Sequence, residues 1–193
     1  YDAFCTATSR TKPSDQSWGR DKRPVINVSW YDAISYCNWR SEQENLDKCY
    51  TINGTNVSCD FTKKGYRLPT ETEWEYAARS GGKDEKYAGT SSDSELAEYA
   101  NYNNTEGKTL PVKSKKPNGK GLYDMSGNVW EWCWDWYGTY SSKDIYGEKS
   151  GSYRVLRGGS WGNDSHDCAS AYRRRYAPTN SYGNLGFRLS RTE

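Results

Sequence analysis

Two side chains near the C-terminal end have types that could do chemistry. Cys168 could act as a nucleophile or a metal ligand, and His166 could exchange protons near neutral pH. His166 lies between Ser165 and Asp167, but adjacent residues of one loop seldom converge as a catalytic triad. It is also the only histidine of the chain, which excludes a metal site built from several histidines. We therefore expect an exposed histidine without a catalytic role.

The six cysteines leave two interpretations open. No two of them are separated by two residues, so the sequence does not favour a zinc ribbon or a thioredoxin-like site. An even number is compatible with three disulfides. Cys49 and Cys59 flank a Gly/Asn turn and would pair most easily, which leaves Cys5–Cys37 and Cys133–Cys168. The alternative is six reduced thiols.

Residues 162–192 have an unusual composition. They include no Lys, Glu, Gln, Met or Trp, although all five types occur earlier in the chain. Ordinary folding does not keep Lys or Glu out of a loop. The run is framed by Arg-Val-Leu-Arg-Gly-Gly-Ser-Trp (154–161) and Asn-Leu-Gly-Phe-Arg-Leu (184–189), which predict apolar strands and a tight turn. We expect rigid frames around a surface that offers hydrogen bonds and rings.

The composition predicts one globular domain over residues 1–193. Only 34% of residues are hydrophobic and the mean hydropathy is −1.10, but 15% are aromatic, so the core should be built from rings. A net charge of +2 disfavours nucleic acid as a partner. No apolar run approaches the ~20 residues of a membrane span, and no secretion signal is visible. Tyr1 begins inside a patterned segment, so we expect an N-terminal part to be missing.

The elements that must position these residues are two helices followed by short strands. Ser29 and Asp32 form a capping-box pattern before a helix from Trp30 to about Glu44. A second capping box, Thr70 to Glu73, begins a helix that ends at the Gly81-Gly82 pair. Short strands are expected near residues 87–89, 109–112, 121–123, 129–136, 153–157 and 186–189. This order predicts an α+β fold with short antiparallel strands and long loops.

Five motifs show a family resemblance. They are Pro-Val-Ile-Asn-Val-Ser-Trp (24–30), Tyr-Arg-Leu-Pro-Thr-Glu-Thr-Glu-Trp-Glu-Tyr-Ala-Ala-Arg (66–79), Gly-Leu-Tyr-Asp-Met-Ser-Gly-Asn-Val-Trp-Glu-Trp (121–132), Arg-Gly-Gly-Ser-Trp (157–161) and Asn-Leu-Gly-Phe-Arg (184–188). Together they resemble the formylglycine-generating-enzyme, or sulfatase-modifying factor, domain over nearly the whole chain. The resemblance implies an elaborated C-type lectin fold. The N-terminal strands usual in that family are absent, which agrees with a fragment.

The resemblance also locates the family's catalytic positions. The enzyme oxidises a substrate cysteine with two copper-binding cysteines, which would fall two and seven positions after Trp161. Those positions hold Asn163 and Cys168. An amide cannot replace a soft thiolate as a copper(I) ligand, so we do not expect an enzyme. Family branches that hold a non-haem iron with several histidines are excluded by the single histidine.

One metal site is implied by the same resemblance. In the family, a calcium ion is held around the Gly-Asn-x-Trp-Glu motif. The matching groups are the carboxylates of Asp124 and Glu131 and the backbone carbonyls of Gly127 and Val129. Hard oxygen ligands suit Ca²⁺. The alternative is that these groups only bond the N–H groups of the turn. No cofactor is required, and a structural Ca²⁺ is the only one implied.

The composition of residues 162–192 is typical of one branch, the variable proteins of diversity-generating retroelements. There, adenines are replaced mainly in AAY codons, which cannot yield Lys, Glu, Gln, Met or Trp. Those are the missing types. Tyr, Ser, Gly and Asn are also the residues that antibody loops favour, because rigid rings give contact area at low entropic cost. The resemblance therefore implies that residues 154–189, the variable segment, form a diversified ligand-binding surface.

We expect this surface to bind a protein or peptide ligand and no nucleic acid. The chain would be a monomeric, non-enzymatic receptor or adhesin. By resemblance, it would be shown on the bacterial outer membrane by a lipid anchor outside this chain. The alternatives are a cysteine oxidase with an altered site and a structural or regulatory domain with one fixed partner. Ser160, Trp161, Leu185 and Phe187 are expected to be scaffold. The expected ligand surface consists of Gly162, Asn163, Asp164, His166, Asp167, Tyr172, Arg174, Tyr176, Thr179, Asn180 and Tyr182.

Overall fold

The computed structural model describes residues 1–140 and 145–192. Its helices are α1 (Asp2–Ala7), α2 (Trp30–Gln43), α3 (Glu71–Ala78) and α4 (Leu96–Tyr99). The two predicted helices correspond to α2 and α3. The short helices α1 and α4 were not predicted, because one or two turns are too short to show helical periodicity. No helix in the described part of the chain is both long and apolar enough to span a membrane.

Both predicted helix starts are confirmed at atomic detail. The Ser29 hydroxyl accepts a hydrogen bond from the N–H of Asp32, and the Asp32 carboxylate accepts one from the N–H of Ser29. Thr70 and Glu73 make the same reciprocal pair at the start of α3. Each box satisfies two N–H groups that would otherwise lack a partner at a helix terminus.

The strands form three small sheets. The hairpin β1 (Tyr50–Asn53) and β2 (Asn56–Cys59) stands alone, and β3 (Tyr66–Arg67) pairs with β8 (Ser190–Arg191). The main sheet has the order β6-β5-β4-β7, with β4 (Trp130–Trp136) and β5 (Arg154–Arg157) in the middle. Its outer strands are β6 (Arg173–Tyr176) and β7 (Leu185–Gly186). With its few helices and small sheets, the fold is α+β, as predicted.

Several predicted strands are wrong in detail. Residues 109–112 and 121–123 form no strand, and near 87–89 only an isolated bridge joins Tyr87 to Thr90. Of the strand expected at 186–189, only Gly186 lies in a strand, β7, and residues 187–189 connect β7 to β8. The sequence predicted antiparallel strands, but among the strands of the described residues β4 pairs with β7 in parallel, and an isolated bridge between Asn101 and Gly127 is parallel too. Because Gly and Asn turns also break up loops, they do not distinguish a short strand from an extended loop.

The central strand β4 is covered on both faces, which explains its run of aromatic residues. Trp130 and Trp132 pack into the same buried cluster as Trp30 of α2, whereas Cys133 packs with Trp74 of α3. Two of the ring nitrogens find acceptors: Trp30 Nε1 donates to the Cys133 carbonyl at 2.9 Å and Trp132 Nε1 to the Val28 carbonyl at 3.1 Å, whereas Trp130 Nε1 is buried without a hydrogen bond. A sheet between two helices therefore holds the core, as the aromatic composition predicted.

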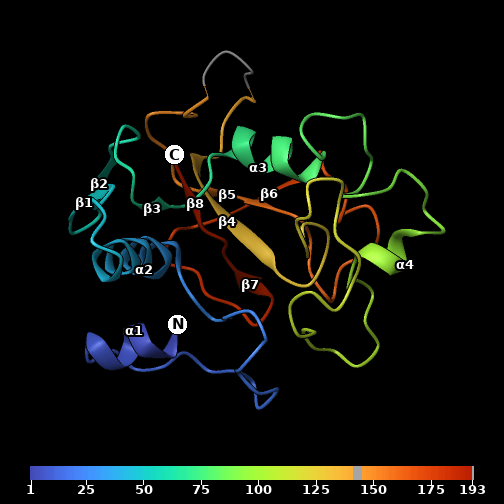
Figure 1. The fold of residues 1–193 in the computed structure, drawn as a ribbon, viewed down its shortest axis with the longest axis horizontal. Coiled ribbons are helices and arrows are strands. Elements are labelled where there is room, and N and C mark those ends of the chain that lie inside the picture. The colour runs from blue at the N-terminus through green and yellow to red at the C-terminus, as the bar shows by residue number, and fades with distance from the viewer. Residues whose placement is uncertain (141–144, 193) are drawn as a thin grey trace.

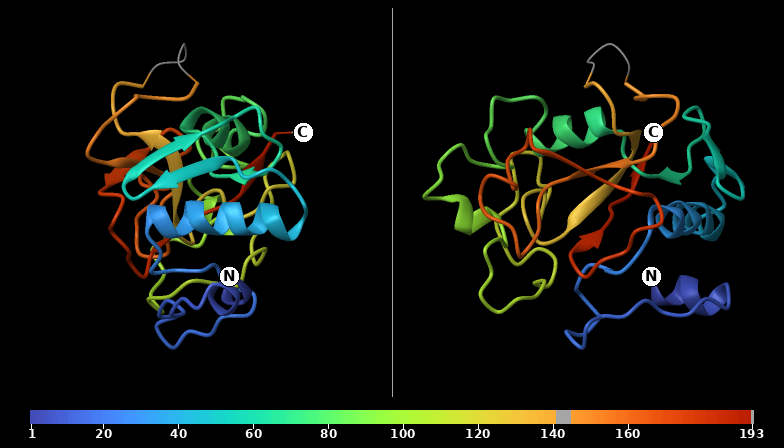
Figure 2. Two further views of the ribbon diagram at one scale, coloured as in Figure 1. Left: turned by 90° about the vertical axis from the view of Figure 1, so that its left-hand side faces the viewer. Right: turned by 180° about the vertical axis from the view of Figure 1, so that it is seen from behind.

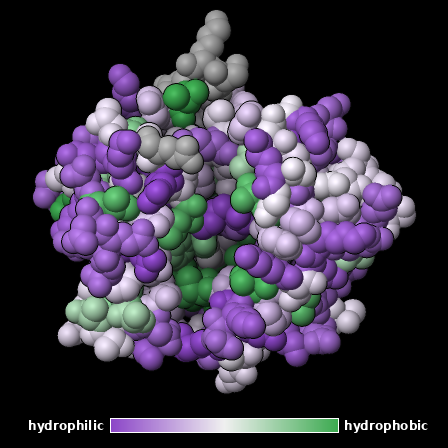
Figure 3. All heavy atoms as spheres, viewed as in Figure 1, coloured by the Kyte–Doolittle hydropathy of each residue, from purple (hydrophilic) through white to green (hydrophobic). Residues whose placement is uncertain are grey.

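The helices lie at different ends of the molecule. Figures 1 and 2 show α1 and α2 together at one end of the molecule and α4 at the opposite end, among the long loops between α3 and β4. Figure 3 shows a hollow near the middle of one face with hydrophobic side chains on its walls. A cavity of about 510 Å³ lies between the N-terminal segment, α2 and the chain leading to β8, and Tyr1, Tyr36 and Phe187 are among its lining residues. It contains no residue of the expected ligand surface.

All six cysteines are free thiols, so none of the three disulfides considered from the sequence is present. Within the hairpin, Cys59 lies opposite Tyr50 and not opposite Cys49. Side chains alternate between the two faces of a strand, so a shift of one residue directs the two thiols apart. Cys133 and Cys168 belong to different buried clusters. The even number of cysteines was therefore misleading.

Candidate ligand-binding site

The chain leaves the sheet at the end of β5 through a turn that only glycine fits. After β5, Gly158 and Gly159 adopt φ angles of +97° and +73°. A Cβ atom on Gly159 would lie 2.8 Å from the Cys168 sulfur and 3.0 Å from the Asp167 carbonyl oxygen. The positive φ and the close approach of the loop both exclude larger residues. The Gly-Gly pair thus allows the loop of residues 162–170 to pack closely against the end of β5.

Both ends of the segment are fastened to the Gly-Asn-Val-Trp turn. The N–H of Trp161 donates to the Asn128 carbonyl at 3.0 Å, and the N–H of Trp130 donates to the Asn184 carbonyl at 2.8 Å. The Trp161 ring then donates to the Gly183 carbonyl at 3.2 Å. The two frames therefore lie close together although more than twenty residues separate them in sequence, and the residues between them form a closed loop system.

Buried ion pairs hold β5 and β6 to α3. Arg157 of β5 is fully buried and pairs with Glu75 and with Glu71, whose Oε1 lies 3.2 Å from its Nε. Arg173 of β6 binds Glu71 with two hydrogen bonds of 2.6 and 2.7 Å. Two-pronged guanidinium–carboxylate contacts have defined geometry, so they orient the β5–β6 pair relative to the helix.

Cys168, at the position of a catalytic cysteine of the enzyme family, is held as an unreactive thiol. The Cys168 side chain is fully buried, and burial, followed by the charges of Asp167 and Asp164, raises its pKa to about 12. A thiol with such a pKa stays protonated near neutral pH, whereas the thiolate is the nucleophile and metal ligand. At the second position, Asn163 accepts a hydrogen bond from Ser160 and donates one to Asp167. Asn163 therefore has a structural role beside its predicted ligand-facing one.

Every residue of the expected ligand surface is exposed or half-buried, and none is fully buried. Four of its rings lie in a row made of two pairs, which the buried ring of Trp130 and the Arg174 side chain connect. The His166 ring lies 4.8 Å from that of Tyr172, which lies 6.0 Å from Trp130, and the Tyr176 and Tyr182 rings are 5.0 Å apart. The Arg174 guanidinium joins the two halves, since it lies over both Trp130 and Tyr176 at 5.6 and 5.3 Å. Gly162, Thr179 and Asn180 lie outside this row.

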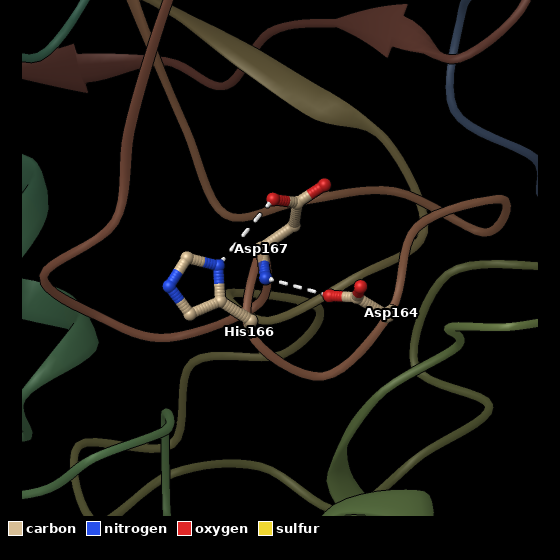
Figure 4. A group of neighbouring side chains, drawn as sticks. All are labelled: Asp164, His166 and Asp167. Atoms are coloured by element: carbon tan, nitrogen blue, oxygen red, sulfur yellow. Dashed lines mark hydrogen bonds and ion pairs between the residues drawn. The ribbon is translucent and has the colours of Figure 1, made fainter.

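One end of the row carries two carboxylates. Figure 4 shows Asp164, His166 and Asp167 on one loop, with His166 Nδ1 3.9 Å from Asp167 Oδ1 and the Asp167 N–H donating to Asp164 at 3.3 Å. The His166 side chain is 78% exposed, as predicted from the sequence. Their ligand atoms lie within 4.8 Å of one another, but exposed acidic groups commonly cluster without binding a metal. We treat the group as the acidic end of the surface.

The sequence did not predict to which face of the sheet each side chain of Arg173–Arg175 points. Arg173 and Arg175 both lie over Tyr137, at 4.6 and 4.9 Å, whereas Arg174 points to the other face of the sheet. Alternation along a strand would have separated them, had the residues been recognised as a strand. Exposed rings outside the segment, Tyr140 and Tyr153, border the Arg173–Arg175 face.

The expected scaffold residues divide into two groups. Ser160 and Leu185 are fully buried. Trp161 and Phe187 are only half-buried, and Trp161 packs edge-on against Trp18 with ring centres 5.5 Å apart. The indole covers the surface next to the turn instead of filling the core.

The groups expected around calcium are already engaged with protein partners. Both oxygens of Glu131 accept hydrogen bonds from Arg188, at 2.6 and 2.8 Å, and Trp74 Nε1 donates to the same carboxylate at 2.6 Å. The Gly127 carbonyl accepts the Val129 N–H at 3.0 Å. Asp124 accepts the Lys113 N–H, and burial raises the pKa of its carboxyl group. Arg188 and Trp74 thus occupy Glu131, the carboxylate expected to bind Ca²⁺, and calcium binding stays a prediction.

Comparison with known proteins agrees with this architecture. Residues 2–193 match the model of the sulfatase-modifying factor enzyme 1-like domain. The chain is 37% identical to the formylglycine-generating enzyme of Streptomyces coelicolor over 89% of its length, and 33% identical to the chaperone protein LppX of Paenibacillus barcinonensis over 90%. It spans 54% of the first relative and 71% of the second.

Among solved structures, the chain is similar to Treponema denticola variable protein 1, with a TM-score of 0.85 and 41% identity. That match covers 96% of this chain and 79% of the other. CarF matches with a TM-score of 0.74 and 34% identity, over 91% of this chain and 70% of the other. The predicted fold, a C-type lectin fold of the formylglycine-generating-enzyme type, is therefore confirmed. The chain belongs to the sulfatase-modifying factor family and is similar within it to a variable protein.

Proposed function

We propose that this protein is a non-enzymatic binding protein whose variable segment, residues 154–189, presents a diversified ligand surface. One observation carries the proposal. The residues that would be diversified lie exposed or half-buried around a row of rings, while the frames on either side are anchored by buried glycine, serine and leucine residues. A surface arranged in this way can change its side chains at little cost to the fold, because surface substitutions usually alter stability within ~0.5 kcal/mol.

The chemistry of the loop supports binding over catalysis. The single thiol in the loop, Cys168, is buried and protonated, and an amide stands at the position of the second family cysteine. Two thiolates are what copper(I) would require. The similarity to Treponema denticola variable protein 1, at 41% identity, points in the same direction.

The ligand class follows from the shape and composition of the surface. A row of aromatic rings with charges at two places is the type of surface that antibody loops use against proteins, since rigid rings contribute contact area at low entropic cost. A C-type lectin fold does not by itself imply sugar binding. We therefore propose a protein or peptide ligand, bound by a monomer. Display at the cell surface through a lipid anchor outside this chain is part of the same proposal.

A selection experiment tests binding. A displayed library of small protein domains is panned against the wild-type protein, and each enriched domain is measured against a variant in which Tyr172, Arg174 and Tyr182 are replaced by Ala, Gln and Ala. We expect binding to fall at least about tenfold, as for central interface residues. A matched control replaces Tyr76, an exposed tyrosine of α3, and should bind normally. Ligands that bind equally well to both variants would contradict the proposal.

Diversification has its own test. The DNA beside the gene should contain a near-identical template copy of the region encoding the variable segment and a reverse-transcriptase gene. In the template, the codons for ligand-surface residues should be rich in adenine. If the neighbourhood contains neither element, the surface binds one fixed partner and is not rewritten.

The second candidate function is cysteine oxidation, which the relatives named formylglycine-generating enzymes favour. The assay supplies copper(I), oxygen and a cysteine-containing peptide, and follows the aldehyde product by mass spectrometry. We expect no turnover above that of the Cys168→Ser variant. Steady turnover that is lost in this variant would replace the binding proposal with an enzymatic one.

A further inference from the structure

The outer strand β6 has an open edge. It pairs with β5 through the register Arg154↔Tyr176 to Arg157↔Arg173 and forms one border of the main sheet. Within residues 1–140 and 145–192, no backbone group of β6 makes a hydrogen bond outside the ladder with β5. An outer strand presents every second pair of N–H and C=O groups away from the sheet, and these groups can pair with another extended chain.

The three arginines of β6 are not equivalent. Arg173 is engaged by two hydrogen bonds to Glu71 and by one to the Gly138 carbonyl, to which it donates at 3.0 Å. Arg174 and Arg175 form no ion pair with any carboxylate of the described residues. Each instead lies over aromatic rings, Arg174 over Trp130 and Tyr176 and Arg175 over Tyr137 and Tyr153.

These contacts prepare both guanidinium groups for an anion. An arginine stacked on a ring retains its N–H donors, which lie in the plane of the group and match a carboxylate with two parallel hydrogen bonds. The rings limit the motion of the side chains, so less conformational entropy is lost when the bonds form. Successive residues of a strand point to opposite faces, which places one such guanidinium on each face of the same edge.

We propose that β6 is the docking edge for an extended, acidic segment of the ligand protein, which adds a strand to the sheet. Two consecutive carboxylate residues of that segment point to opposite faces of the extended sheet, one toward Arg174 and the other toward Arg175. This inference deepens the proposed function, because Arg174 belongs to the ligand surface. It adds the backbone edge and Arg175, which the ligand surface predicted from the sequence does not include.

An acidic protein segment fits better than a nucleic acid. Among the described residues, this edge carries two guanidinium groups without a carboxylate partner, whereas a phosphate backbone needs a longer row of positive charge. Asp164 and Asp167 lie on the loop that precedes β6, and the chain as a whole carries a net charge of only +2. A local pair of anions fits this distribution of charge. A continuous polyanion would also lie against Asp164 and Asp167, whose negative charges repel it.

The test uses short synthetic peptides and NMR spectroscopy of the isotope-labelled protein. The first peptide, Thr-Val-Glu-Glu-Val-Thr, has adjacent glutamates. The second, Thr-Glu-Val-Glu-Val-Thr, separates them by one residue and so directs both to one face. The third carries lysines in place of the adjacent glutamates. We expect shifts at β6 amides and slower exchange of their outward N–H groups with the first peptide. Its affinity should exceed that of the second about twofold to fivefold, the share of one exposed ion pair.

The variants Arg174→Gln and Arg175→Gln should each weaken the first peptide about twofold to fivefold and remove its advantage over the second. The matched control is Arg191→Gln, an exposed strand arginine that lies over Tyr66 at 5.9 Å, and it should change nothing. Equal binding of the glutamate and lysine peptides, shifts away from β6, or stronger binding of a single-stranded oligonucleotide would each overturn the inference. Library ligands that depend on Tyr172 and Tyr182 would still support the proposed function in that case.

Discussion

Tyr182 and Tyr176 differ in how much of each ring is buried by the fold, although both belong to the proposed ligand surface. Tyr182 is 43% exposed, whereas Tyr176 is half-buried and packs against the main core cluster. We expect Tyr182→Ala to change the free energy of unfolding by no more than ~0.5 kcal/mol and Tyr176→Ala to cost more. Denaturant titration measures both. A large loss for Tyr182→Ala would show that this ring belongs to the core and not to the binding surface.

The buried thiol of Cys168 should react slowly while the protein is folded. Its folded pKa of about 12 exceeds the ordinary value of 9.0, so the folded state favours the protonated thiol. Because only the thiolate reacts with alkylating reagents, iodoacetamide should label Cys168 much more slowly in the folded protein than in denaturant. Peptide mass spectrometry reports the site. Rapid labelling at neutral pH in the folded protein would indicate a reactive, enzyme-like cysteine.

At the level of elements, Asp135 links the end of β4 to the start of α3. Its carboxylate accepts the Glu71 N–H at 2.7 Å, and burial, together with the charge of Glu71, raises its pKa from 3.8 to about 7. A raised folded pKa favours the protonated group, so the contribution to stability is complete below the unfolded pKa and is lost as pH rises through the folded pKa. Ionisation of this buried carboxyl should therefore destabilise the folded protein as the pH rises from about 4 to about 7, although the charged carboxylate still accepts the Glu71 N–H.

The variant Asp135→Asn tests this link, because an amide still accepts the Glu71 N–H but carries no charge. Relative to wild type, its free energy of unfolding should rise by an amount on the order of a few kcal/mol as pH increases through this range. Chemical denaturation at several pH values measures the difference. Asp164→Asn, which removes an exposed carboxylate, serves as the control for net charge. A difference that does not depend on pH would contradict the assignment.

The two tryptophans beside the variable segment should differ in their effect on stability. Trp130 of β4 is fully buried, so Trp130→Ala should cost about 3–5 kcal/mol. The sequence predicted that Trp161 is scaffold too, and a fully buried Trp161 would show the same loss on replacement by Ala. Trp161 is half-buried, so we now expect a smaller loss from its replacement. Equal losses in a thermal or denaturant experiment would mean that the Trp161–Trp18 contact is part of the core.

How much the sequence predicted depended on whether a feature leaves a local signal. The capping boxes at Ser29 and Thr70 are local, and both helices begin where they predict. The pairing of β4 with β7 joins residues more than fifty positions apart, and nothing near Leu185 indicates a parallel partner. Composition indicated the proposed ligand surface, because it reflects which residue types are present, and that surface stays a prediction. It did not indicate the open edge of β6 or the stacking of Arg175, which depend on strands brought together by folding.

For the whole molecule, the proposal separates a scaffold that sustains the fold from a surface that determines the ligand. The frames are anchored by Gly159 against Cys168, by Arg157 against α3, and by Trp130 against Asn184. None of these anchors uses the side chain of a ligand-surface residue. Simultaneous replacement of Asp164, His166, Thr179, Asn180 and Tyr182 by serine should therefore leave a folded protein.

The melting temperature of this five-residue variant should fall by no more than about 5 °C, since a loss of 1 kcal/mol shifts the midpoint of a chain of this size by about 2–4 °C. Light scattering should give the monomer mass of 22.1 kDa for both proteins. Domains selected on the wild type should lose affinity, while new domains should be selectable on the variant. Collapse of the fold would show that scaffold and surface are not separable, because a protein whose ligand surface also sustains its core cannot be diversified freely.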